Sequence, residues 1–129
     1  SQVLLSPDIR LVAIANAETA PYGIAASEYL SELGLQDSID KKFVFGESVG
    51  QVSQYLLTGS VDAGFTSNSF RTKYKEGFKF VPLDTSQYNP MIISESVLKG
   101  KVSQSSPLFN FMRTERAISI FEHFGYLSL

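Results

Sequence analysis

The sequence of 129 residues contains no cysteine, one histidine and no dense run of lysine or arginine. The absence of cysteine excludes disulfides, thiol catalysis and thiolate metal sites. One histidine among scattered carboxylates gives no ligand cluster of recognisable spacing, so the sequence predicts no metal site. A formal net charge of −2 provides no basic field, and we therefore expect no nucleic-acid partner.

Nucleotide-binding motifs, targeting segments and membrane spans are also missing. Neither G-x-x-x-x-G-K-S/T nor G-x-G-x-x-G occurs, so a nucleotide cofactor has no support. The first residues, SQVLLSPDIR, hold no signal peptide and lead almost at once into an apolar strand, which favours a piece of a longer protein. With 43% hydrophobic and 19% charged residues, the chain can bury one core or two small lobes.

Up to Leu83 the sequence repeats one pattern, an apolar strand followed by a polar turn and a helix. Strands are predicted at residues 11–15, 42–45 and 61–66. Helices are predicted at about residues 21–33, 48–58 and 69–74. Residues 36–41 form a mostly polar connection. This alternation indicates an α/β fold with the polar turns on one side of a sheet.

After Leu83 the sequence changes character. Residues 79–83 predict an edge strand, because Pro82 cannot donate to a ladder, and residues 91–97 predict a further strand. A helix is predicted to start near Ser105, with proline near its first position. It opens a Phe-rich tail (residues 105–126) whose apolar face needs a second lobe or a partner, or drives self-association. That face consists of Leu108, Phe109, Phe111, Met112, Ile118, Phe121 and Phe124.

The polar turns lie in stretches without positive charge. No lysine, arginine or histidine occurs between Leu11 and Asp40 or between Val44 and Phe70. An anion at these turns would depend on backbone N–H groups and helix dipoles, which favours a small inorganic tetrahedral anion over an organic phosphate. An ordinary turn without a ligand is the alternative interpretation. The hydroxyls available at the turns are those of Thr19, Ser48, Ser67 and Ser69.

Residues 46–50 (GESVG) match the G-x-S-x-G turn of serine hydrolases, between a predicted strand and a predicted helix. In that alternative Ser48 is the nucleophile, with Asp62 or Asp84 and then His123 as its partners. The chain is far shorter than such enzymes usually are, and no HGGG-type oxyanion stretch precedes the turn. The competing interpretation of Ser48 is a helix N-cap.

Residues 14–26 (IANAETAPYGIAA) resemble the signature IANPxTAPYGxAA of periplasmic molybdate-binding proteins, the solute-binding subunits of molybdate ABC transporters. At matching spacings, LGL at residues 33–35, FGESVGQ at residues 45–51 and TGSVDAGF at residues 58–65 resemble the family stretches LGL, GENVxQ and TGxADAGF. The run FEHFGY at residues 121–126 resembles the closing family helix. The resemblance covers nearly the whole chain, but only the carboxyl-terminal part of the family's length.

The resemblance implies an α/β, type II periplasmic-binding-protein fold. Residues 1–84 then correspond to the second lobe, whose βα units line the anion cleft. Residues 85–129 correspond to the hinge crossing and the carboxyl-terminal segment that belongs to the first lobe. The family's opening strand and the serine-bearing turns of its first lobe are missing, so the resemblance implies a fragment.

The resemblance also implies ligand-binding residues. Tyr22 and Val49 occupy positions whose backbone N–H groups meet the oxyanion, molybdate or tungstate. The third position falls on Ser67, where several family members carry a tyrosine that contacts the anion. Thr19 and Ser48 would cap or support the helix starts. The implied protein is periplasmic or lipid-anchored, is not an enzyme, needs no cofactor, and delivers its ligand to the membrane permease of an ABC transporter.

Overall fold

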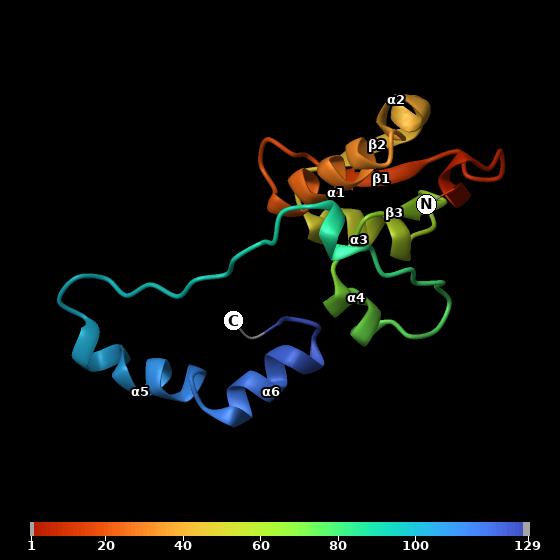
Figure 1. The fold of residues 1–129 in the computed structure, drawn as a ribbon. Helices are drawn as coiled ribbons and strands as arrows, with labels where there is room; N and C mark the ends of the chain where they lie inside the picture. The colour runs from red at the N-terminus through yellow and green to blue at the C-terminus, as the bar shows by residue number, and fades with distance from the viewer. Residues whose placement is uncertain (1, 128–129) are drawn as a thin grey trace.

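In the computed structural model, which describes residues 2–127, parallel strands form a three-stranded sheet in the order β2-β1-β3. Helices cover both faces of this sheet (Figure 1). In chain order the elements are η1 (Gln2–Leu5), β1 (Val12–Ala15), α1 (Pro21–Glu32), α2 (Gln36–Ile39), η2 (Asp40–Lys42), β2 (Phe43–Gly46), α3 (Val49–Leu57), β3 (Ala63–Gly64), α4 (Asn68–Lys73), η3 (Thr85–Gln87), α5 (Val102–Met112) and α6 (Glu115–His123). The predicted alternation of strand, turn and helix is confirmed.

Strand β1 is the centre of the sheet, with β2 and β3 hydrogen-bonded on either side. All four of its residues are buried, and alternate residues face opposite sides of the sheet. One cluster consists of Leu4, Val12, Ile14, Ala26, Leu30 and Ile39. The other consists of Ala13, Ala15, Ala20, Val52 and Val61. Helix α1 therefore packs on one face of the sheet and helix α3 on the other.

The two connections of the sheet run in opposite directions. The β1–α1–β2 unit moves from β1 to one neighbour, and the β2–α3–β3 unit returns across β1 to the other. Right-handed crossovers then place α1 and α3 on opposite faces, in agreement with the two clusters. Where the direction switches, both helices begin beside the carboxyl end of the central strand, which is where parallel α/β sheets bind ligands.

Glycines allow both helices to lie close to the sheet. A Cβ atom at Gly46 would lie 3.2 Å from Val52 Cγ2, and one at Gly64 would lie 3.3 Å from Val52 Cγ1. A Cβ atom at Gly23 would overlap the Ala15 carbonyl oxygen. Larger residues at these positions would push α3 or α1 outward. The glycines thus fix how near the two helix starts come to the strand ends.

Two predictions for the first part of the chain are wrong in detail. Residues 36–41, predicted as a polar connection, form α2 and part of η2. The reason is Ile39, which is fully buried in the core and so holds this segment in a compact turn of helix. Strand β3 is only Ala63–Gly64, much shorter than the predicted residues 61–66, because only these residues pair with β1.

The predictions for the second part need larger corrections. Residues 79–83 and 91–97, predicted as strands, have no regular secondary structure, since no strand among residues 2–127 is available to pair with them. Helix α5 begins at Val102 and carries Pro107 in its interior rather than near its start. The chain breaks at Thr114, whose hydroxyl accepts the Ala117 N–H and so caps a separate helix, α6.

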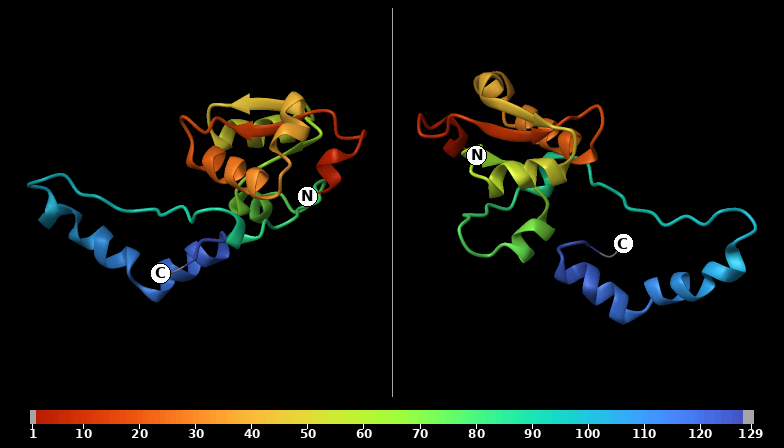
Figure 2. Two further views of the ribbon diagram at one scale, coloured as in Figure 1. Left: turned by 45° about the horizontal axis from the view of Figure 1, so that its top comes forward. Right: turned by 180° about the vertical axis from the view of Figure 1, so that it is seen from behind.

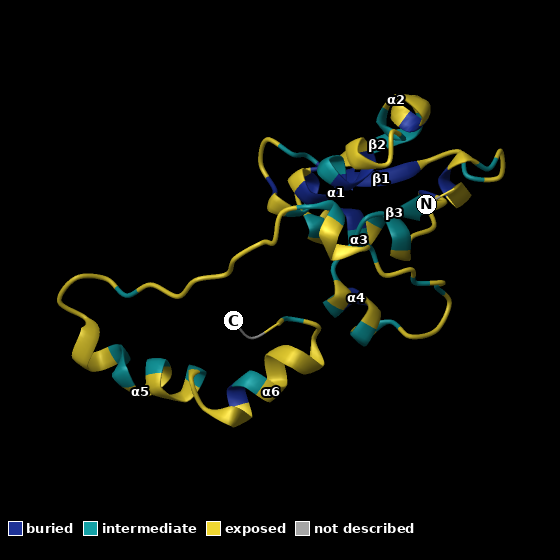
Figure 3. Cartoon of the chain, viewed as in Figure 1, coloured by how far each residue is buried: buried dark blue, intermediate teal, exposed yellow. Residues whose placement is uncertain are grey.

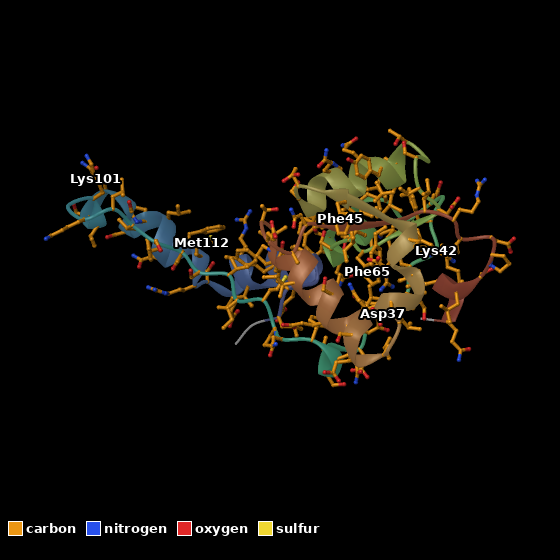
Figure 4. The ribbon with its side chains drawn as sticks, turned by 90° about the horizontal axis from the view of Figure 1, so that it is seen from above. Asp37, Lys42, Phe45, Phe65, Lys101 and Met112 are labelled. Atoms are coloured by element: carbon orange, nitrogen blue, oxygen red, sulfur yellow. The ribbon has the colours of Figure 1, made fainter. Side chains whose placement is uncertain are left out.

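The chain leaves the sheet after η3 and returns toward it through α5 and α6 (Figure 2). Figure 3 shows most of this part as exposed, and Figure 4 shows α5, between Lys101 and Met112, well to the side of the sheet. No helix within residues 2–127 combines the length and the apolar character that a bilayer span needs. Exposed large apolar residues on the two helices and at the C-cap of α6 are Val102, Leu108, Phe111, Ile120, Phe121 and Phe124.

Side chains hold the segment that precedes β1. Asp62 Oδ2 accepts hydrogen bonds from the backbone N–H groups of Leu11 (2.9 Å) and Arg10 (2.8 Å). These two bonds hold the pKa of the Asp62 carboxyl below its ordinary value of 3.8, and the bond from Leu11 has the larger effect. Lys42, labelled in Figure 4, donates from Nζ to the Leu4 carbonyl oxygen at 2.9 Å. Asp62, just before β3, thus fastens the residues that lead into β1, and Lys42 at the end of η2 fastens η1.

We predict that Gly23→Ala destabilises the chain by about 3 kcal/mol, because the added methyl group must displace α1 from the Ala15 carbonyl. Urea unfolding followed by circular dichroism measures this loss. Gly50→Ala is the matched control, since a Cβ atom there has only Ser48 Oγ nearby, at 3.6 Å. Equal stability of the two variants would show that α1 does not need the close approach.

We predict that Asp62→Asn lowers the free energy of unfolding at neutral pH. A carboxyl group whose pKa is depressed by folding stabilises the fold above its unfolded pKa, and that contribution disappears as the pH falls through the folded value. The difference from the wild type should therefore shrink in acid. Urea unfolding at a series of pH values tests this, with exposed Glu76→Gln as control. A difference that stays constant with pH would contradict the prediction.

Candidate functional site

The polar turns meet at one edge of the sheet, which we call the carboxyl edge (residues 16–22, 46–50 and 65–69). The parallel register sets Ala15 opposite Gly46, and the N–H of the next residue, Asn16, donates to the Gly46 carbonyl oxygen at 2.7 Å. Thr19 Oγ1 donates to the Glu47 carbonyl oxygen at 3.3 Å. Thr19, predicted as a supporting residue, thus links the first polar turn directly to the second.

The start of α1 is organised by Asn16 and Pro21. Asn16 accepts the Ala20 N–H through its carbonyl oxygen (2.8 Å) and the Glu18 N–H through Oδ1 (2.9 Å). Pro21 is the first residue of the helix and has no N–H to satisfy. Tyr22 follows, and its N–H has no hydrogen-bond partner among the described residues. A single donor at the helix start, assisted by the dipole, is thus left for a ligand.

The start of α3 has the same design with different residues. Ser48 is the N-cap and its hydroxyl accepts the Gln51 N–H at 3.3 Å, as the cap interpretation predicted. Gln51 in turn accepts the Glu47 N–H through Oε1 at 2.7 Å. Within residues 2–127 these bonds leave the N–H groups of Val49 and Gly50 without a partner. The second helix start therefore also offers backbone donors at the carboxyl edge.

The third turn is more closed. The hydroxyls of Ser67 and Ser69 lie 2.7 Å apart and hydrogen-bond to each other, so Ser67 does not cap α4 with its side chain. The Thr66 hydroxyl is similarly paired with that of Ser53 at 2.8 Å. Ser67 lies at the expected edge, but its hydroxyl is engaged within the turn. The structure thus brings Tyr22, Val49 and Ser67 to one edge, and within residues 2–127 the backbone N–H groups of all three residues have no hydrogen-bond partner.

The charge at the carboxyl edge is low and negative. Its only charged side chains are Glu18 and Glu47, which are both exposed. The two ion pairs formed within residues 2–127, Arg10 with Asp62 and Arg113 with Glu95, lie in other parts of the chain. Attraction for an anion must therefore come from backbone N–H groups and helix dipoles, which are fixed and do not titrate.

The residues of the hydrolase alternative are not brought together. Ser48 lies at the carboxyl end of the sheet, whereas Asp62 bonds to residues just before β1, at the opposite end. Asp84 caps η3 by accepting the Ser86 N–H at 2.9 Å. The His123 ring packs against Phe124, with ring centroids 5.2 Å apart. Within residues 2–127 no base therefore lies beside Ser48, which acts as a helix cap.

The sequence did not predict that the end of the Phe-rich tail contacts α4. Thr72 Oγ1 on α4 donates to the His123 carbonyl oxygen at 3.3 Å. Gly125 lies against the Asn68 side chain so closely that a Cβ atom would overlap it. A shallow hollow between α4 and α6 lies beside this contact and shares only Asn68 with the carboxyl edge. Its lining is basic and consists of Asn68, Arg71, Thr72, Lys75, Phe80 and His123.

Tyrosines from distant segments converge on the start of α1. Tyr22 is half-buried there, and burial raises the pKa of its phenol, with further upward contributions from Tyr126 and then Tyr88. Asn89, next to Tyr88, donates from its N–H and side chain to the Glu28 carboxylate at 2.8 and 2.9 Å. No local pattern in the sequence signals this convergence, because it depends on where the tail returns.

Known proteins are similar to this chain in sequence and in fold. The model of the family described as bacterial extracellular solute-binding protein matches residues 2–127. Molybdate-binding protein ModA of Azotobacter vinelandii is 33% identical over 96% of this chain and 51% of its own length. ModA of Rhodobacter capsulatus is 30% identical over 97% of this chain and 50% of its own length. The chain thus spans about half the length of the curated relatives it matches.

A solved structure agrees with these sequence matches. The periplasmic molybdate-binding protein of Azotobacter vinelandii superimposes with a TM-score of 0.81 and 26% identity, covering 99% of this chain and 58% of that one. The predicted α/β periplasmic-binding fold is therefore confirmed, for part of its length. Since the family model matches residues 2–127, from η1 to the end of the tail, the chain belongs to the bacterial extracellular solute-binding proteins.

Proposed function

We propose that this chain is the part of a periplasmic solute-binding protein that holds molybdate, or the similar tungstate, for an ABC importer. The observation that carries the proposal is the pair of helix starts with free N–H groups, α1 and α3, at an edge without cationic side chains. The names of the ModA relatives support molybdate as the ligand. The proposed role is transport, and no observation favours catalysis.

The donors suit a tetrahedral oxyanion. In the proposal, the N–H of Tyr22 binds one oxygen, and the N–H groups of Val49 and Gly50 bind others from the opposite side. Hydrogen bonds to an ionised acceptor are shorter and stronger than neutral ones, and two aligned helix dipoles add to them. Because no titrating cation takes part, this binding should vary little with pH near neutrality. Thr19 and Ser48 support it by fixing the two turns.

We further propose that the chain contains one lobe and part of another. Residues 1–84 form the second lobe with its half of the cleft, and residues 85–129 form the crossing and the return to the first lobe. The relatives are about twice as long as the matched region, which leaves room for the remainder of that lobe. Closure of two lobes around the anion would complete its hydrogen bonds and create the form that a membrane permease recognises.

We predict that Val49→Pro weakens molybdate binding by roughly tenfold or more, the cost of one charge-assisted hydrogen bond. Proline is well tolerated at the first position of a helix, and Ser48 before it already has extended backbone angles (φ −153°, ψ 162°) that proline requires. The substitution thus removes the N–H while leaving α3 in place. Isothermal titration calorimetry on the intact parent protein measures the change.

Val49→Ala is the control for that variant, since it shortens the side chain but keeps the N–H, and its affinity should stay near that of the wild type. Circular dichroism establishes that both variants are folded. A Val49→Pro protein with unchanged affinity would remove the α3 helix start from the proposed site.

We predict that the 129-residue chain alone binds molybdate far more weakly than the parent protein, because the donors of the first lobe are absent from it. Titration of molybdate into both, with sulfate as the competing tetrahedral anion, tests the ligand and the lobe assignment together. Tight molybdate binding by the isolated chain would overturn the lobe assignment. Failure of the parent to bind either anion would overturn the ligand assignment.

A further inference from the structure

The hollow between α4 and α6 lies beside the proposed anion site and has a volume of about 440 Å³. Its walls come from α4, from the chain that follows α4 and from the end of α6 (Figure 1). The hydrogen bond from Thr72 Oγ1 to the His123 carbonyl oxygen joins two of these elements directly. The hollow is therefore built by two segments that lie far apart in the sequence.

The lining of the hollow is positively charged. Arg71 and Lys75 are exposed, and neither takes part in an ion pair within residues 2–127. None of the described lining residues carries a carboxylate. Residues 71–79 contain four of the eleven lysines and arginines of a chain with a net charge of −2, and Glu76 is their one acidic residue. This concentration of positive charge favours an anionic occupant.

The hollow also has an apolar wall. Phe80 lines it and is half-buried, and its ring packs against those of Phe70 and Phe78, with centroids 5.9 and 6.0 Å apart. The methylene groups of an acidic side chain gain from contact with such a wall, whereas a bare inorganic anion does not. Small-molecule sites enclose most of their ligand, but this hollow is shallow. Its shape and chemistry therefore suit an acidic side chain that projects from a protein.

We propose that this hollow is a docking site for an acidic segment of a protein partner, whose carboxylates bind Arg71 and Lys75. The Arg71 guanidinium can hold a carboxylate through two parallel hydrogen bonds, and Lys75 supplies a second cation. Because the walls belong to two segments, the site is complete only while the end of the tail lies against α4. A partner that binds here recognises that arrangement. The docking site does not depend on the ligand proposed for the carboxyl edge.

The test uses the peptide hexaglutamate, titrated into the intact parent protein and followed by amide chemical shifts. We expect shifts at Thr72 and His123, and weaker binding as the salt concentration rises. The double variant Arg71→Gln with Lys75→Gln should bind the peptide roughly tenfold more weakly, because two exposed ion pairs are lost. Wild-type protein without shifts at Thr72 and His123 would overturn the proposal.

The matched control is the double variant Lys73→Gln with Lys99→Gln, which removes the same charge outside the hollow. Lys73 lies over the Tyr74 ring, with Nζ 5.2 Å from the centroid, and Lys99 is exposed in the segment before α5. Its affinity for hexaglutamate at physiological salt should stay near that of the wild type. An equal loss in both double variants would attribute binding to overall charge and would overturn the proposal.

A second pair of variants tests whether the tail completes the site. Gly125→Ala places a methyl group against the Asn68 side chain and pushes the tail away from α4 without a change in charge. Gly100→Ala is its control, because Gly100 has nearly the same φ (+84° against +85°) and nothing within 4 Å of an added Cβ atom. We expect hexaglutamate binding to weaken several-fold in Gly125→Ala alone. Equal affinities, with both variants folded by circular dichroism, would overturn the role of the tail.

Competing ligands separate this site from other kinds of site. Saturating molybdate should leave hexaglutamate bound, and displacement of the peptide would overturn the proposal by placing it at the carboxyl edge. Glutarate, a free dicarboxylate, should bind much more weakly than the peptide, and equal affinity would indicate a small-molecule site instead. Vesicles of phosphatidylglycerol that bind through Arg71 and Lys75 would indicate a membrane surface instead. Peptide binding by a parent that does not bind molybdate would support the docking site and overturn only the proposed function.

Discussion

The close contact between the first turn of α1 and the end of β1 is the constraint on which the rest of the structure depends. Because Gly23 has no side chain, the helix begins directly against the Ala15 carbonyl, and the preceding turn must fold tightly around Asn16. That turn touches the second through Thr19, which links both helix starts. Burial of β1 on both faces anchors the strand whose carboxyl end both helix starts adjoin.

Local signals predicted the βα part of the chain well. Pro21 and Ser48 marked helix starts through fixed backbone geometry and side-chain capping, both of which depend only on near neighbours. The same is true of the ends at Gly34 and Gly59, which adopt φ of +64° and +67°. Ile39 was misjudged because its role depends on a core assembled from distant residues. Tertiary burial there outweighed a polar local sequence.

The later part of the chain was harder to predict for a physical reason. A strand exists only when another strand satisfies its backbone, and residues 91–97 have no such neighbour in the described range. Pro107 likewise suggested a helix start, whereas the helix begins at Val102 and tolerates the proline inside. The candidate site shows the same division. Tyr22 and Val49, which the family resemblance implied, lie at helix starts that local residues mark, whereas the contact of the tail with α4 follows only from the path of the whole tail.

The chain between Asn89 and His123 is attached to the βα part of the structure at both of its ends. Glu28 on α1 holds the first end, and Thr72 on α4 holds the second. The intervening residues therefore form a closed loop, whose helices can explore only a limited volume beside the sheet. Because both ends of the loop are already held, a surface that packs on its apolar face would not have to supply the entropy of closing the loop. The two attachments thus restrict how far the exposed apolar residues of α5 and α6 can move away from the sheet.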